Sequence, residues 1–147
     1  MDVNKDFKEF LELLNRHNCK YVIVGGYAVI FHGYPRFTGD IDIYYQLGEQ
    51  NTKSLLTALK EFGFDFLELT PEELNKKGQI FQLGNPPNRI DLINQADGIE
   101  FDQVWENKVE GKYGNLPVYF ISLDDLMKNK RAADRNKDRG DVEHLKN

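Results

Sequence analysis

The 147-residue sequence contains a single cysteine, Cys19, so no disulfide can form within the chain. It also has no apolar run approaching the ~20 residues that a membrane-spanning helix needs. The N-terminal residues contain no signal-peptide core. Together these absences predict a cytoplasmic protein with no membrane segment, stabilised by its core and not by covalent cross-links.

A net positive charge is missing as well. The formal net charge is -5, which argues against a surface coated for non-specific binding of nucleic acid. A composition of 40% hydrophobic and 29% charged residues is typical of a globular protein. The length predicts one domain over residues 1–147, with a C-terminal helical segment from about 122 to 147. Basic residues gather in that segment at Lys128, Lys130, Arg131, Arg135, Lys137 and Arg139.

Hydrophobic periodicity changes between helical and strand spacing along the chain. Apolar residues at Phe7, Phe10, Leu11 and Leu14 predict an amphipathic helix over residues 5–16. The same analysis predicts further helices over 27–32, 51–62, 71–76, 122–134 and 137–147, and strands over 21–24, 40–45, 64–69, 80–83, 89–93 and 118–121. Because strands and helices are interspersed, the expected fold class is α+β or α/β.

Two aspartates interrupt an otherwise apolar strand at Asp40-Ile-Asp42. Residues i and i+2 of a strand share a face, so Asp40 and Asp42 project together while Ile41 and Ile43 face the core. Neighbouring carboxylates repel each other, and a shared divalent cation removes that cost. Mg²⁺ suits the role because it prefers oxygen ligands and retains water and phosphate oxygens. Asp91 interrupts another apolar strand and is the best candidate for a third carboxylate.

The pair Gly25-Gly26 stands between a predicted strand and a predicted helix, where backbone N–H groups can approach a phosphate closely. Arg36 could grip the same phosphates with two hydrogen bonds, and Lys130 could balance the charge of a triphosphate. Each feature also has an ordinary explanation: a tight turn, an exposed strand face or edge, or a solvated helix face. The order of strand, Gly-Gly, helix, arginine, Asp-Ile-Asp and a later aspartate favours a catalytic explanation.

These motifs resemble the nucleotidyltransferase superfamily related to DNA polymerase beta. That superfamily combines a hydrophobic strand, Gly followed by Gly or Ser, about a dozen residues, Asp-x-Asp or Asp-x-Glu, and a later third acid. The stretch from Gly25 to Asp42 is similar, more narrowly, to small stand-alone nucleotidyltransferase-like proteins of toxin–antitoxin and abortive-infection systems. The tail over residues 126–138 resembles their closing pattern, a lysine on a helix followed by Arg-x-Lys-Asp. Gly26 stands where other members have serine, which removes a hydroxyl.

The resemblance implies the polymerase-beta-like fold, a mixed central β-sheet flanked by helices, with the nucleotide held against the Gly-Gly turn. It implies that Asp40 and Asp42 bind Mg²⁺ and the triphosphate, with two ions expected and Mn²⁺ as an alternative. Asp91 would complete the metal site and help to deprotonate an acceptor hydroxyl. The expected enzyme is a nucleotidyltransferase, whose acceptor attacks the α-phosphate of a nucleoside triphosphate and releases pyrophosphate.

The acceptor is left open by the sequence: an RNA end, a protein hydroxyl or a small molecule such as an aminoglycoside or lincosamide antibiotic. An alternative function is a catalytically inactive binding module, one half of a toxin–antitoxin-type pair whose partner protein is encoded nearby. The intact acids at all three positions weigh against that alternative. A structural calcium site is disfavoured because the sequence has no EF-hand spacing.

Overall fold

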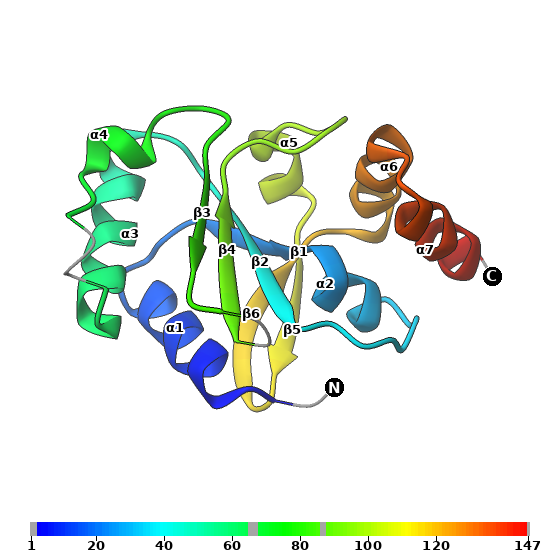
Figure 1. The fold of residues 1–147 in the computed structure, drawn as a ribbon, viewed down its shortest axis with the longest axis horizontal. Helices are drawn as coiled ribbons and strands as arrows, with labels where there is room; N and C mark the ends of the chain where they lie inside the picture. The colour runs from blue at the N-terminus through cyan, green and yellow to red at the C-terminus, as the bar shows by residue number, and fades with distance from the viewer. Residues whose placement is uncertain (1–2, 65–67, 86–87, 147) are drawn as a thin grey trace.

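A six-stranded mixed β-sheet forms the centre of the molecule within the residues that the computed structural model describes, 3–64, 68–85 and 88–146 (Figure 1). Its strands are β1 (Tyr21–Val24), β2 (Asp40–Tyr45), β3 (Ile80–Leu83), β4 (Arg89–Ile93), β5 (Val109–Tyr113) and β6 (Leu116–Phe120). They lie in the order β3-β4-β2-β1-β6-β5. The pairs β1–β6 and β2–β4 are parallel, whereas β1–β2, β3–β4 and β5–β6 are antiparallel. The expected α+β fold with a mixed central sheet is confirmed.

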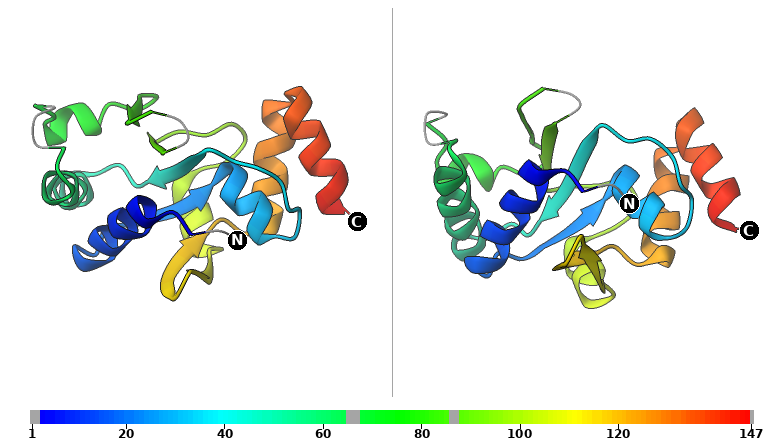
Figure 2. Two further views of the ribbon diagram at one scale, coloured as in Figure 1. Left: turned by 60° about the horizontal axis from the view of Figure 1, so that its bottom comes forward. Right: turned by 90° about the horizontal axis from the view of Figure 1, so that it is seen from below.

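Helices gather at opposite ends of this sheet, as Figures 1 and 2 show. The helices are α1 (Lys5–Arg16), α2 (Gly25–Phe31), α3 (Glu49–Phe62), α4 (Pro71–Leu74), α5 (Phe101–Glu106), α6 (Leu123–Ala133) and α7 (Asn136–Lys146). Helices α1, α3 and α4 lie at one end, and α6 and α7 lie together at the other. Among the described residues, no helix is long and apolar enough to cross a bilayer.

The core lies between the sheet and helices α1 and α3. Every residue of β1 is buried, and Ile41 and Ile43 are buried on β2 as the alternation predicted. Helix α1 buries Phe7, Phe10 and Leu14 and is capped by Asn4, whose side chain accepts hydrogen bonds from two backbone N–H groups of the first turn. One side of β2 is therefore fixed by apolar packing, which leaves the other side free to carry polar residues.

Several predicted elements differ from the structure. Helix α2 begins at Gly25 and α3 at Glu49, two residues earlier than their apolar patterns suggested. The predicted strand over 64–69 is absent at residues 64, 68 and 69, while residues 65–67 lie outside the described part of the chain. Strand β5 and helix α5 were not predicted. Strand β5 lies at the edge of the sheet with most of its side chains exposed, so it lacks the apolar alternation of a half-buried strand.

Candidate active site

The register between β2 and β4 brings the three predicted acids together. The two strands are parallel neighbours, with Asp40 opposite Arg89 and Asp42 opposite Asp91. Neighbouring strands lie about 4.8 Å apart, and paired residues share a face. Asp91 is 7% exposed, so the third carboxylate is buried beside the acid pair. The sequence predicted the residues of this cluster, and the sheet order supplies their proximity.

Arg89 joins two of these acids and was given no role by the sequence analysis. Its guanidinium donates from Nε to Asp91 Oδ1 at 2.8 Å and from Nη2 to Asp40 Oδ2 at 2.8 Å and to Asp91 Oδ2 at 3.1 Å. The available signal was its position two residues before Asp91, which puts both side chains on one face of β4. One guanidinium thus offsets part of the charge of two carboxylates.

The charge of the cluster is not fully balanced. Burial raises the pKa of the Asp42 carboxyl to about 7, and the charge of Asp91 and a hydrogen bond with it act in the same direction. The positive charge of Lys137 opposes this shift. Asp40 Oδ1 is buried and has no hydrogen-bond partner among the described residues. An added cation would therefore be stabilised here.

The donor set fits a hard divalent cation. It consists of carboxylate oxygens, including the orphaned Asp40 Oδ1 and those of Asp42, whose pKa burial raises to about 7. Among the described residues, no three His, Cys, Asp or Glu side chains are gathered closely enough to form a ready-made cage. The hydrogen bonds of Arg89 engage two of the three acids, so the acids would have to rearrange around a metal.

Both glycines of the Gly-Gly pair are required by close packing against this cluster. Gly25 has a φ of +65°, and a Cβ there would collide with the Asp42 carboxylate. A Cβ on Gly26 would lie 2.5 Å from the Thr38 hydroxyl oxygen. The start of α2 therefore lies directly against the acids, at the place where the sequence predicted a phosphate cradle.

A cavity of about 570 Å³ lies over the acids, and we call it the nucleotide cavity after the ligand that the sequence predicts. All the candidate residues proposed from the sequence border it: Gly25, Gly26, Arg36, Asp40, Asp42, Asp91 and Lys130. Arg89, Arg135 and Lys137 border it too, so five basic side chains surround the carboxylates. Its size lies within the usual range for a pocket that binds a small molecule or cofactor.

Arg36 and Lys130 are engaged by acids of α7. Arg36 makes the expected two-pronged grip, but on Asp141, at 3.0 and 3.2 Å. The Lys130 ammonium lies 3.1 Å from Asp138 Oδ1 and 3.2 Å from Asp141 Oδ2, and the residue is 3% exposed. These contacts attach the loop before β2 to the pair α6–α7, which stands beside the sheet in Figure 2.

Comparisons with known proteins show the family and the fold of this chain. The model of a family described as "Nucleotidyltransferase of unknown function (DUF6036)" matches residues 2–146. The chain belongs to this family. No curated protein matches it at a significant level. A solved structure described as the lincosamide antibiotic adenylyltransferase LnuA, bound to lincomycin, is similar with a TM-score of 0.63 at 19% identity, covering 99% of this chain and 98% of that chain. At that identity the likeness shows the fold, and membership of the family identifies the chain as a nucleotidyltransferase.

Proposed function

We propose that this nucleotidyltransferase transfers a nucleoside monophosphate from a Mg²⁺-bound nucleoside triphosphate to a hydroxyl group. The observation that carries this proposal is the unbalanced carboxylate cluster of Asp40, Asp42 and Asp91, in a cavity with the glycine turn and five basic side chains. Buried like charges with an orphaned oxygen are costly in the metal-free protein. A cationic ligand that the reaction uses would explain why these carboxylates lie together in the fold.

The three acids hold distinct positions in this mechanism. Asp40 and Asp42 would hold Mg²⁺, which when bound supplies charge stabilisation for the triphosphate and the attacking oxygen. The acceptor oxygen bonds to the α-phosphorus, the bond to the bridging oxygen of the β-phosphate breaks, and pyrophosphate leaves with that electron pair. Asp91 receives the proton of the acceptor hydroxyl. Arg89 orients the Asp91 carboxylate through two hydrogen bonds.

The basic side chains would act on the triphosphate in two ways. Lys137 lines the cavity, is exposed, and lies close enough to Asp42 to lower its pKa, so we propose that it contacts phosphate directly. Arg36 and Lys130 are held by Asp141, so they would contribute a fixed positive field at the edge of the cavity. Gly25 and Gly26 would let the nucleotide approach the backbone at the start of α2.

The acceptor proposed for the first test is a small molecule. The similar solved structure is named an antibiotic adenylyltransferase and contains lincomycin, which makes adenylyl transfer to a hydroxylated small molecule a direct choice. RNA ends and protein hydroxyls are the other acceptors to compare. A partner protein encoded nearby would place the enzyme in a toxin–antitoxin-type pair.

The test incubates the pure protein with each α-³²P-labelled nucleoside triphosphate and Mg²⁺, Mn²⁺ or a chelator, with lincomycin, kanamycin, total RNA or a protein extract. We expect label to move to one acceptor class, and the rate to fall by at least about 10³-fold in Asp42→Asn and with chelator. Asp134→Asn, which changes an exposed acid outside the cavity, is the matched control. If the wild-type protein neither transfers label nor binds nucleotide by calorimetry, the inactive binding module replaces this proposal.

A further inference from the structure

A second cavity, of about 630 Å³, adjoins the nucleotide cavity, and we call it the acidic cavity. The two share Gln95, Ala96 and Asp97 as lining residues, so the turn after β4 forms the wall between them. A volume of this size accommodates a drug-sized molecule. A ligand there would lie next to a nucleotide bound over the acids of β2 and β4.

The same face of the sheet runs beneath both cavities. Tyr44 follows Asp42 by two residues on β2, so it faces the same side, about 7 Å further along the strand. It lies opposite Ile93 just as Asp42 lies opposite Asp91. Tyr44 lines the acidic cavity and is 2% exposed, and its hydroxyl forms no hydrogen bond to another described residue. A buried ring with an unpaired hydroxyl is suited to contact a ligand.

The charge of this cavity is opposite in sign to that of the basic side chains next to it. Its charged lining residues are the acids Asp97, Glu100 and Asp102, with Lys77 as the basic one. None of the three acids forms an ion pair with a described residue, and all are exposed. The acidic cavity therefore attracts cations and repels a polyanion.

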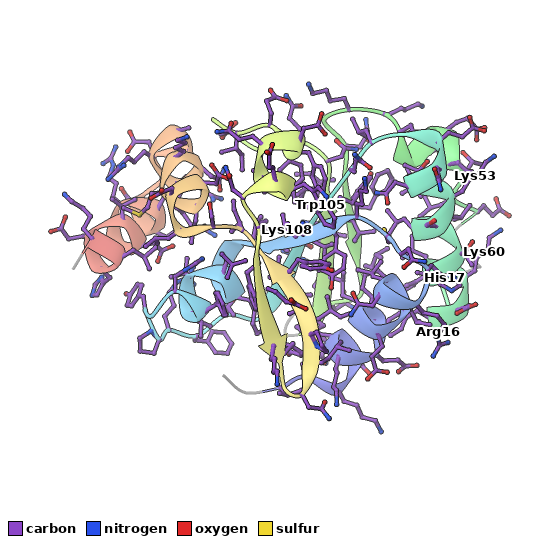
Figure 3. The ribbon with its side chains drawn as sticks, turned by 180° about the vertical axis from the view of Figure 1, so that it is seen from behind. Arg16, His17, Lys53, Lys60, Trp105 and Lys108 are labelled. Atoms are coloured by element: carbon purple, nitrogen blue, oxygen red, sulfur yellow. The ribbon has the colours of Figure 1, made fainter. Side chains whose placement is uncertain are left out.

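Contacts on both sides hold the backbone of the wall and helix α5 in place. Asn129 of α6 donates to the Asp97 carbonyl oxygen at 3.0 Å. On α5, Phe101 is buried and stacks with Trp105 at a centroid distance of 6.1 Å. The Lys108 ammonium lies 3.9 Å from the Trp105 ring centroid on the back of the molecule (Figure 3). The acidic cavity is thus preformed, which lowers the entropic cost of binding.

We infer that the acidic cavity is the acceptor site and that it binds a small molecule carrying a protonated amine and a hydroxyl. The inference rests on the proposed function, whose acceptor class it specifies. The amine pairs with Glu100 and Asp102, a polar atom of the ligand bonds to the Tyr44 hydroxyl, and a hydroxyl points past the wall toward Asp42 and Asp91. An RNA end is the least compatible acceptor because its phosphates would meet three unpaired carboxylates.

The test measures binding without nucleotide by calorimetry at low salt, with kanamycin as the cationic polyhydroxyl probe. Maltotriose, a neutral polyol, and a short single-stranded RNA are the comparison probes. The double variant Glu100→Gln/Asp102→Asn removes the charges, and Glu106→Gln on the same helix α5, outside the cavity, is the matched control. We expect the wild-type protein to bind kanamycin at least about tenfold more tightly than either other probe. The double variant should bind kanamycin about tenfold more weakly than the wild type, and Glu106→Gln should bind it as the wild type does.

ATP binding in the presence of Mg²⁺ separates this inference from the proposed function. Kanamycin binding that is absent, or equal in the double variant and the wild type, overturns the inference even where ATP binding and transfer are normal. Tighter binding of maltotriose or RNA than of kanamycin also overturns it. If the wild-type protein does not bind ATP, the proposed function is overturned instead. The difference in kanamycin affinity between the wild type and the double variant still decides whether the cavity selects cations.

Discussion

Two clusters of charged side chains border the nucleotide cavity, and they differ in how their charges are matched. Between α6 and α7, Asp138 and Asp141 contact Lys130, with Arg135 bonded to Asp138 and Arg36 to Asp141. Between β2 and β4, one arginine contacts two of the three carboxylates, and one Asp40 oxygen has no partner among the described residues. Both carboxylates of the first cluster have cationic partners, and we call it the complete cluster. The second leaves a carboxylate oxygen without a partner, and we call it the incomplete cluster.

The pKa values of one acid from each cluster show the consequence. Burial acts to raise the pKa of Asp138, but hydrogen bonds from Arg135 and Lys130 outweigh it and hold the pKa below its ordinary range. Burial raises the pKa of Asp42 to about 7, and Asp91 adds to the shift. A buried acid supplied with cations supports the fold, whereas a buried acid left without one is a candidate for ligand binding.

The largest expected change in stability comes from removing Lys130, the shared cation of the complete cluster. Lys130→Met leaves two buried carboxylates without their shared ammonium, and breaking a buried ion pair from one side costs about 3–5 kcal/mol. We expect the free energy of unfolding, measured by urea denaturation, to fall by that amount. Arg131→Met, at an exposed position of the same helix, is the control and should change little. Equal losses in both variants would show that the network does not stabilise the fold.

Removing a charge from the incomplete cluster should instead raise the free energy of unfolding. Because the pKa of Asp42 is higher in the folded protein, its contribution to stability is present below about pH 4 and is lost as the pH rises toward 7. Asp42→Asn escapes this loss, so it should be more stable than the metal-free wild type by roughly 2 kcal/mol at pH 8, allowing for screening at a partly exposed carboxylate. Thermal unfolding in chelator at pH 4 and pH 8 measures the difference. A variant less stable than wild type at pH 8 would contradict this explanation.

A smaller effect is expected when the existing cation of the incomplete cluster is removed. Arg89→Gln frees Asp40 and Asp91 from a competing positive charge, so Mn²⁺ should bind about tenfold more tightly in the absence of nucleotide. Electron paramagnetic resonance of free Mn²⁺ gives the affinity directly. Arg135→Gln borders the same cavity but contacts Asp138, and it serves as the control. Weaker Mn²⁺ binding in Arg89→Gln would mean that the arginine holds the carboxylates in place for the metal.

The smallest effect is expected at an exposed pair that belongs to neither cluster. Asp134 caps α6 in a left-handed conformation and pairs with Arg139 at 2.8 Å, with both side chains exposed. Asp134→Asn keeps a residue that tolerates this conformation and loses only a screened charge. The melting temperature should stay unchanged within error. A clear decrease would indicate that exposed pairs matter in this chain as much as buried ones.

Much of the fold and the candidate site was predictable from local patterns. The amphipathic spacing of residues 5–16 gave the bounds of α1, and alternation gave those of β2. The bounds of β1, β3 and β4 came from short apolar runs that end at glycine or proline turns. Edge strand β5 was missed because its exposed residues lack an apolar pattern, and short helix α5 because six residues are too few to show helical periodicity. Arg89 was missed because its spacing from Asp91 places it on one face of β4 but does not show that Asp40 of the neighbouring strand lies within its reach.

By itself, the sequence determined the α+β class, the residues of the Gly-Gly and Asp-x-Asp motifs, and the resemblance to nucleotidyltransferases that the family match confirmed. These depend on residue type and on spacing within one element, which a linear chain preserves. Only the tertiary structure decided that Arg89 lies between two acids, that Asp141 holds Arg36 and Lys130, and that an acidic cavity adjoins the nucleotide cavity. Those features join residues tens of positions apart, and strand order and helix packing bring them into contact.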